Sequence, residues 1–314
     1  MRPRVLVVGS ANMDMVLSMP RMPQEGESIV SEHYAYIPGG KGANAAVSAA
    51  RVGADVIFCA RIGNDENGER LLDAYRGEGI DVRYVKRDKT GSTGLAVVLL
   101  DERTGKNRIV VYPSANLNLT VDDVETAFLS YPDAVFIQFE TNANAIIAAT
   151  EFAAQQKIPV FIDAGPFRKD FAMPVYELLQ NVEILSPNEV EMAQMTGINP
   201  TNAETCLQAC IKLNSMIKAK NIVIKLSDRG CFLYDGKYHE MITANNVKAV
   251  DTTAAGDAFT AALAVEYLKT KKLSHSCKYA NVAGALAVTQ FGAMSSLPTG
   301  NQIETFIAAR NLKI

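Results

Sequence analysis

Short apolar runs and amphipathic stretches alternate along most of the chain. The runs have the length and β-branched content of buried strands, and several stretches between them place apolar residues three and four apart, as one face of a helix does. Predicted strands cover residues 5–8, 56–60, 135–139, 160–162, 183–185 and 222–226, and predicted helices cover 41–52, 68–76, 143–155, 203–216, 256–268 and 274–289. This alternation predicts an α/β fold with a largely parallel central sheet flanked by helices.

Two segments, 15–37 and 93–111, break the alternation with period-two, β-prone stretches. The second contains a predicted strand over 95–100, a turn over 102–106 and a strand over 108–112. Together the segments predict a small antiparallel layer outside the main sheet, which we interpret as a lid. Such a layer is only marginally stable by itself, so it would need contacts with a ligand, the core or a second subunit. A homodimer that forms through the lid is therefore expected. Residues 1–314 are expected to form a single α/β domain with the two lid segments inserted in it.

Composition and charge narrow the class of protein. Of the 314 residues, 48% are hydrophobic and the formal net charge is −3, with acidic and basic residues mixed along the chain. No long basic run is present to bind a nucleic-acid backbone or an anionic membrane, so neither partner is expected. The apolar run near the N-terminus is too short for a signal peptide, and no stretch approaches a membrane span of about 18 residues. A cytoplasmic protein is expected.

The five cysteines, Cys59, Cys206, Cys210, Cys231 and Cys277, are odd in number and contain no CxxC pair. Cys206 and Cys210 would share one face of a helix and could in principle bind a metal. Without a second Cys or His pair at a suitable spacing, semi-buried thiols are the preferred interpretation. A reducing compartment agrees with this composition.

The strongest local motif is DTTAAGDAF at residues 251–259, just before an apolar helical run. Small residues at a helix N-terminus allow backbone N–H groups to approach an anion, and the helix dipole adds a favourable charge. The motif therefore predicts a phosphate-binding turn. Asp257 lies in the first helical turn, where its carboxylate either caps the helix or accepts a proton from a hydroxyl aimed at the phosphate.

A second motif, GGKGAN at residues 39–44, opens a predicted helix. It matches neither the P-loop nor the dinucleotide-binding glycine pattern, so hydride transfer loses its usual sequence signature. Taken alone, such a motif is more often a structural glycine turn than a functional one. Lys41 and Asn44 place polar groups beside this permissive backbone.

The third motif is NEVE at residues 188–191, after a predicted strand and a Ser-Pro break. One interpretation is a capping box between Asn188 and Glu191, with no role beyond stability. The other is that both side chains hold hydrated Mg²⁺, which keeps most of its waters and needs few protein ligands.

These three motifs, in this order and over nearly the whole chain, resemble those of the ribokinase family of sugar and nucleoside kinases. The resemblance implies a ribokinase-like fold and ATP-dependent phosphorylation of ribose at its 5-hydroxyl. Asp257 would be the general base, and the N–H groups of Ala254, Ala255 and Gly256 the anion hole. Such chemistry depends on positioning and charge stabilisation more than on covalent participation of the protein.

The resemblance also implies ligand contacts. The sugar would contact Asn12, Asp14, Gly40, Lys41, Asn44, Glu140 and Asp257. ATP would contact Asn188, Lys225, Ser227, Gly230, Gly256 and Asn281. Asn188 and Glu191 would hold magnesium through water, and an activating potassium ion would lie among Asp251, Thr253, Ala287, Gln290, Gly292 and Ser296. Asp14 and Glu140 taken alone would instead be solvated loop carboxylates.

Two positions depart from the family pattern. Residues 163–166 read DAGP where many members carry an Asn-Pro-Ala-Pro-like stretch, and Asn281 occupies a nucleotide-facing position that is often His. A relative acting on deoxyribose, fructose or a nucleoside is therefore an open alternative. A sugar-sensing protein without turnover is a second one, and the intact Asp257 with its glycine turn argues against it. A nicotinamide dehydrogenase is the remaining alternative.

Overall fold

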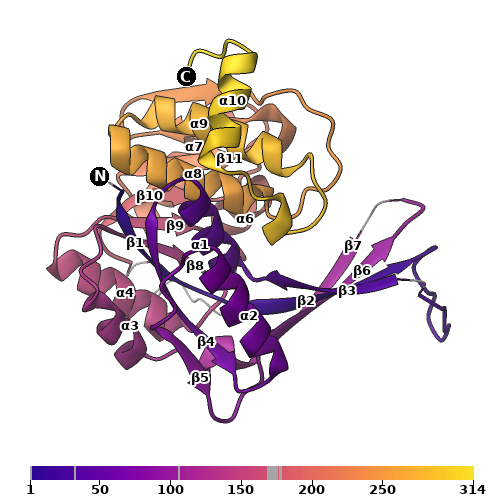
Figure 1. Ribbon diagram of the computed structural model, residues 1–314. Coiled ribbons are helices and arrows are strands. Elements are labelled where there is room, and N and C mark those ends of the chain that lie inside the picture. The colour runs from indigo at the N-terminus through magenta and orange to yellow at the C-terminus, as the bar shows by residue number, and fades with distance from the viewer. Residues whose placement is uncertain (1, 32, 105–106, 168–175, 177–178) are drawn as a thin grey trace.

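The central sheet follows the predicted α/β class. The structure is a computed structural model that describes residues 2–31, 33–104, 107–167, 176 and 179–314. Within those residues the main sheet has nine strands in the order β13-β12-β11-β10-β9-β8-β1-β4-β5 (Figure 1). The strands are β1 (Arg4–Val8), β4 (Asp55–Gly63), β5 (Val85–Asp88), β8 (Ala134–Gln138), β9 (Val160–Asp163), β10 (Val182–Ser186), β11 (Asn221–Lys225), β12 (Cys231–Tyr234) and β13 (His239–Ile242). Pairs from β11 through to β5 are parallel, whereas β12 and β13 add an antiparallel edge.

The apolar runs of the central strands reflect burial on both faces of the sheet. In β1, Val5 and Val7 pack into one hydrophobic cluster, while Leu6 and Val8 pack into the other. Successive side chains of a strand point to opposite faces, so a strand covered on both sides needs an apolar residue at every position.

Helices cover both faces. Helices α1 (Lys41–Arg51), α2 (Glu66–Gly77), α8 (Ala255–Thr270), α9 (Leu273–Ala287) and α10 (Gly300–Ala309) pack on the cluster that contains Val5. Helices α3 (Val121–Phe128), α4 (Ala143–Gln155), α6 (Glu189–Thr196) and α7 (Ala203–Met216) pack on the other. None of the helices in the described ranges is long and apolar enough to cross a membrane.

A separate four-stranded sheet projects from the core, in the order β3-β2-β6-β7 (Figure 1). Its strands are β2 (Asn12–Met19), β3 (His33–Gly39), β6 (Gly94–Asp101) and β7 (Asn107–Tyr112). We call this sheet the lid sheet. Part of the predicted turn over 102–106 lies outside the described residues.

The expectation of a wholly antiparallel layer is wrong. The β2–β3 and β6–β7 pairs are antiparallel, but the central pair β2–β6 is parallel, with Asn12 opposite Gly94. Both strands leave the core at the same place and run outward together, which makes their pairing parallel.

Candidate functional site

Helix α8 begins with exposed backbone donors. Ala254 precedes the helix in the left-handed conformation, with φ of 58°, and no side chain caps the helix N-terminus. The first N–H groups of a helix have no partner within it, and the helix dipole favours negative charge there. The turn predicted from Ala254, Ala255 and Gly256 therefore lies where an anion would be bound.

Asp257 does not cap this helix, so the capping interpretation of its carboxylate is wrong. The residue is buried and faces helix α1. Its Oδ2 accepts a hydrogen bond of 2.8 Å from Asn44 Nδ2, and Lys41 Nζ lies 3.5 Å from its Oδ1. The negative charge of Asp257, and then those of nearby carboxylates, raise the pKa of the Lys41 ammonium, which stays protonated in the site.

The glycine turn before α1 places Lys41 and Asn44 against Asp257. Gly40 has φ of 92°, and a Cβ on it would lie 2.8 Å from the backbone nitrogen of Asn12. A Cβ on Gly42 would lie 2.5 Å from the nitrogen of Ser10. Only glycine permits this approach of two backbone segments. The glycine turn is therefore structural, and it also positions Lys41.

Two further carboxylates lie on the acceptor side of Asp257. Glu140 follows β8 and accepts hydrogen bonds from Ser10 Oγ at 2.5 Å and from the Lys41 N–H at 3.0 Å. Burial, and then the charges of Glu140 and Asp257, raise the pKa of Asp14 to about 7. Three acidic side chains therefore share one small region with the Lys41 cation.

Asn12 is held by a residue that the sequence patterns do not single out. Asn116, in a 3₁₀ turn at Ser114–Asn118, donates from Nδ2 to Asn12 Oδ1 at 2.7 Å and accepts from the Ala11 N–H at 2.8 Å. This leaves the amide nitrogen of Asn12 as the donor toward a ligand. Asn116 follows the lid strand β7 without a recognisable motif, so only the tertiary fold shows its role.

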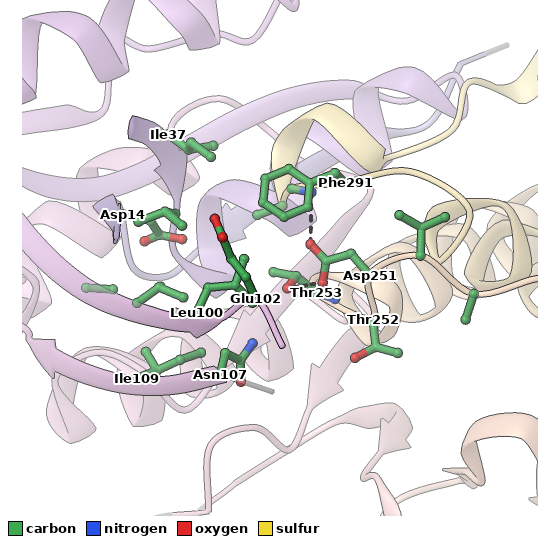
Figure 2. A pocket seen from close by; sticks show the side chains of 17 residues that line it. Asp14, Ile37, Leu100, Glu102, Asn107, Ile109, Asp251, Thr252, Thr253 and Phe291 are labelled. Atoms are coloured by element: carbon green, nitrogen blue, oxygen red, sulfur yellow. Dashed lines mark hydrogen bonds between the residues drawn. The ribbon is translucent and has the colours of Figure 1, made fainter. Parts of the chain in front are cut away.

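A cavity of about 720 Å³ lies between the lid sheet and the loops that precede α8 and follow α9. Figure 2 shows Asp14, Ile37, Leu100 and Ile109 from the lid sheet on one side of it, and Asp251, Thr252, Thr253 and Phe291 on the other. The lid contributes mainly apolar side chains together with Asp14, and the loops contribute both polar side chains, Asp251 to Thr253, and the apolar Phe291. Such a cavity suits a small polar ligand enclosed by an apolar cover.

Asn188 and Glu191 form the capping box that was one of the two interpretations. Asn188 Oδ1 accepts from the Glu191 N–H, and Glu191 Oε2 accepts from the Asn188 N–H, both at 2.8 Å. Glu191 is buried, and burial raises its pKa. The capping box uses only Oε2 of the Glu191 carboxylate.

The residues expected to contact the nucleotide lie along the carboxyl end of β11 and beside β13. Lys225 closes β11, and Ser227 begins a 3₁₀ turn at Ser227–Arg229. A Cβ on Gly230, whose φ is 98°, would lie 2.0 Å from the carbonyl oxygen of Ile242. Asn281, on α9, donates to the carbonyl of the adjacent Thr243 at 3.2 Å. Gly230 and Asn281 therefore flank one short backbone segment.

The residues expected around a monovalent cation are brought together by Asp251. Its Oδ1 accepts from the Thr253 N–H at 2.9 Å, and its Oδ2 accepts from the Gly292 N–H at 2.9 Å. Gln290 lies in the same loop and donates its N–H to the Ala287 carbonyl, while Ser296 donates to Ala293. Backbone carbonyls of these two loops are ligands of the kind that a monovalent cation uses.

In the part of the chain that the structure describes, no group of three or more His, Cys, Asp or Glu side chains is arranged to hold a metal ion. The acceptor-side residues Asn12, Asp14, Gly40, Lys41, Asn44, Glu140 and Asp257 form one connected set. The three expected groups of residues thus lie around the N-terminus of α8.

Comparison with known proteins agrees with this arrangement. The pfkB family carbohydrate kinase profile matches residues 2–300. The ribokinase of Haemophilus influenzae is 31% identical over 309 residues, with 98% of this chain and 99% of that protein covered. The ribokinase of Staphylococcus aureus is 33% identical over 299 residues, with 94% and 96% covered.

Among solved structures, Arabidopsis thaliana ribokinase complexed with ribose and ATP superposes with a TM-score of 0.87 at 30% identity, with 98% of this chain and 99% of that chain covered. The resemblance that the three motifs indicated is confirmed over nearly the full length. The chain belongs to the pfkB family of carbohydrate kinases.

Proposed function

We propose that this protein transfers the γ-phosphate of ATP to the 5-hydroxyl of ribose, giving ribose 5-phosphate and ADP. The observation that carries the proposal is Asp257, held by Asn44 and Lys41 at the uncapped start of α8. A proton acceptor there lies in the first turn of α8, next to the N–H groups that would bind the phosphate. Relatives named as ribokinases, one of them complexed with ribose and ATP, favour ribose over other acceptors.

In the proposed mechanism, the oxygen of the ribose 5-hydroxyl forms a bond to the γ-phosphorus of ATP. Asp257 accepts the proton of this hydroxyl, and the bond between the γ-phosphorus and the ADP oxygen breaks. Charge that develops on the phosphate oxygens is stabilised by the N–H groups of Ala254, Ala255 and Gly256. The Lys41 ammonium lies on the same side, where it adds positive charge beside Asp257.

The sugar would be oriented by Asn12, Asp14, Gly40, Lys41, Asn44 and Glu140. Carboxylates accept hydrogen bonds from hydroxyl groups, and the amides of Asn12 and Asn44 and the Lys41 ammonium donate them. A buried polyol needs partners for each hydroxyl, and this mixture supplies both kinds.

The Asn188–Glu191 pair fits a magnesium ion held through water. Glu191 is a buried carboxylate, and its Oε1 lies close to Gly165. A Cβ added to Gly165 would be only 2.4 Å from this oxygen. When bound, Mg²⁺ would neutralise charge on the ATP phosphates. Asn188, Lys225, Ser227, Gly230, Gly256 and Asn281 would contact the nucleotide.

A potassium ion would be held by oxygens of Asp251, Thr253, Ala287, Gln290, Gly292 and Ser296. Asp251 already joins the two loops that carry these groups. A cation between the loops would fix the turn that presents the N–H groups of α8.

We also propose that residues 1–314 act as one domain whose lid segments, 15–37 and 93–111, close over the sugar. Homodimerisation through the lid sheet is supported by its exposed apolar edges, where Tyr34 is 71% exposed on β3 and Val110 67% exposed on β7. Exposed strand edges of this kind can pair with the edge of another sheet.

A cytoplasmic location is supported by the five cysteines, which are all buried and free.

The test is ATP-dependent phosphate transfer to a panel of pentoses, hexoses and nucleosides, with product identified by mass and by the position of the phosphate. Ribose 5-phosphate is the expected main product. Preferential transfer to another acceptor would replace ribose and keep the kinase, whereas binding of sugar without any transfer would establish the sensing alternative.

A further inference from the structure

A buried ion pair joins the ends of two strands of the main sheet that are not neighbours. Asp163 closes β9 and Lys225 closes β11, with β10 between them. Lys225 Nζ donates to Asp163 Oδ2 at 2.5 Å and to Thr260 Oγ1 at 3.1 Å. Thr260 Oγ1 lies 2.7 Å from the same Asp163 oxygen, so the three side chains form a closed triangle.

This triangle lies directly beneath the anion-binding turn. Thr260 Oγ1 is 3.0 Å from the carbonyl of Gly256, and a Cβ on Gly256 would lie 3.8 Å from Lys225 Nζ. On its other side, Lys225 pairs through the backbone with Asn188, the first residue of the Asn188–Glu191 motif. Lys225 thus approaches the turn through its ammonium and the Asn188–Glu191 motif through its backbone, and these are the two groups that would hold the phosphates.

The pair is buried more deeply than an ordinary structural ion pair. The side chain of Asp163 is 2% exposed and that of Lys225 is 11% exposed. The Lys225 ammonium has three N–H donors, and the bonds to Asp163 and Thr260 use two of them. Burial would raise the pKa of Asp163, but the Lys225 ammonium and then that of Lys41 outweigh it and lower the pKa.

A structural tie is the competing interpretation, and energetics argue against it. Removing two charges from water costs several kcal/mol per ion, and well-packed apolar side chains in their place are often as stable or more stable. A buried ion pair beside an anion site is therefore better explained by function than by stability. The third donor of Lys225 has no partner among the described residues, which is what an incoming phosphate oxygen requires.

We infer that the Lys225 ammonium binds the phosphoryl group during transfer and that Asp163, assisted by Thr260, is the positioning residue that holds the ammonium in place. This inference rests on the proposed kinase function and extends it to a second cation beside Lys41. Because Lys225 lies on the nucleotide side of α8, it acts on oxygens of the γ-phosphate or of the bridge to ADP, where charge increases as the bond breaks.

The experiment compares Lys225→Met, Asp163→Asn and the double variant Asp163→Asn/Lys225→Met by kcat, by KM for ATP and for ribose, and by Tm. Lys225→Met should lower kcat by about 10²-fold, the effect of losing one charge-stabilising donor, with KM for ribose unchanged. Its Tm should fall because Asp163 is left buried and unpaired. Asp163→Asn should keep a charged but unanchored Lys225, and so raise KM for ATP with a smaller loss of kcat.

The double variant separates the two interpretations because it leaves no unpaired charge. If Lys225 binds the phosphoryl group, the double variant recovers Tm and keeps the low kcat of Lys225→Met. If the pair is only a structural tie, kcat returns to the wild-type value together with Tm, and the inference is overturned. Where a single variant does not fold, the double variant gives the answer alone.

Lys220→Met is the matched control. Lys220 precedes the same strand at its opposite end, is 65% exposed and pairs with Glu183 at 2.6 Å. Its kcat should equal that of the wild type. The wild-type protein is measured first on the acceptor panel, so absence of ribose transfer would count against the proposed function. Lys225 would then be assessed on whichever acceptor is phosphorylated.

Discussion

Asn44 donates a hydrogen bond from Nδ2 to Asp257 Oδ2 at 2.8 Å, across 213 positions of the chain. Helices α1 and α8 meet at this bond, and each begins with a glycine-containing turn. The bond fixes the carboxylate of Asp257, and the contact of Oδ1 to Lys41 is longer, at 3.5 Å. A general base needs this kind of orientation before its pKa matters.

Replacing Asp257 tests that role. Asp257→Asn should fold normally and lower kcat by about 10² to 10⁴-fold, the range for a positioned general base. Initial rates of ADP formation and thermal unfolding measure the two quantities. Asp73→Asn, an exposed carboxylate on α2, is the control and should leave both unchanged. Wild-type turnover by Asp257→Asn would remove Asp257 from the mechanism.

Discrimination between ribose and 2-deoxyribose tests the sugar site. Ribose should exceed 2-deoxyribose in kcat/KM by about 5 to 150-fold, since a missing 2-hydroxyl leaves a buried polar group unpaired. Asn12→Met should narrow this gap, mainly because ribose falls. Asn116→Leu removes the bond that orients Asn12 but keeps the Asn12 amide, so the preference for ribose should narrow less than in Asn12→Met. Equal use of both sugars by the unmodified protein would contradict the ribose assignment.

Dependence on the monovalent cation tests the loops around Asp251. Activity should be higher in potassium than in sodium because backbone carbonyls suit the larger ion. Rates are compared at constant ionic strength, with choline chloride as the inert control. Equal rates in all three salts would argue that the loops need no cation.

Closure of the lid sheet tests its proposed role. Ribose together with a non-hydrolysable ATP analogue should slow amide hydrogen exchange in β2, β3, β6 and β7, since closure excludes water from the acceptor. Helix α7, on the far side of the main sheet, serves as the internal reference. Unchanged exchange in both lid segments would count against closure.

The pKa of Asp14, about 7, makes a prediction about stability and pH. An ordinary Asp in the unfolded chain is ionised above about pH 4, whereas the folded protein keeps the proton on Asp14 up to about pH 7. The folded state therefore binds the extra proton between these values, and its stability falls as pH rises through this window. Above pH 7 Asp14 is ionised in the folded protein, and the loss of stability caused by its burial is complete.

Asp14→Asn removes this titration. It should raise the free energy of unfolding at pH 8 by up to about 4 kcal/mol, and by less at pH 5, while weakening sugar binding. Urea unfolding at the two pH values measures the difference. The same increment at pH 5 and pH 8 would show that Asp14 titrates normally.

Local patterns were enough to predict much of the core. The bounds predicted for α4 and α7 agree with the structure, because both helices carry strong caps and long apolar faces. The short helices α3 and α10 were missed, although Thr120 with Asp123 and Thr299 with Gln302 form capping boxes there. An eight- or ten-residue segment offers too few apolar repeats to stand out.

The site was less accessible to sequence reasoning. Asp257, Asn44 and Lys41 lie in recognisable glycine-containing motifs, so their meeting could be anticipated. Asn116 and Thr260 carry no such signature, and their contacts to Asn12 and Asp163 exist only because segments distant in the sequence, a 3₁₀ turn and helix α8 among them, meet strands β2 and β9 in the fold. The direction of the β2–β6 pair likewise depends on where both strands leave the core, which no local pattern encodes.

The register at the base of the lid sheet has a mechanical consequence. Asn12 lies opposite Gly94 in the first residue pair of β2 and β6, so β2 would both line the proposed sugar site and connect the lid sheet to the core. Asp14, opposite Ala96, lies two residue pairs further out on the same strand. A rotation of the lid sheet would therefore displace Asn12 and Asp14, which are proposed to contact the sugar. We therefore expect sugar binding and lid closure to occur in a single movement. The product would be released only when the lid opens again.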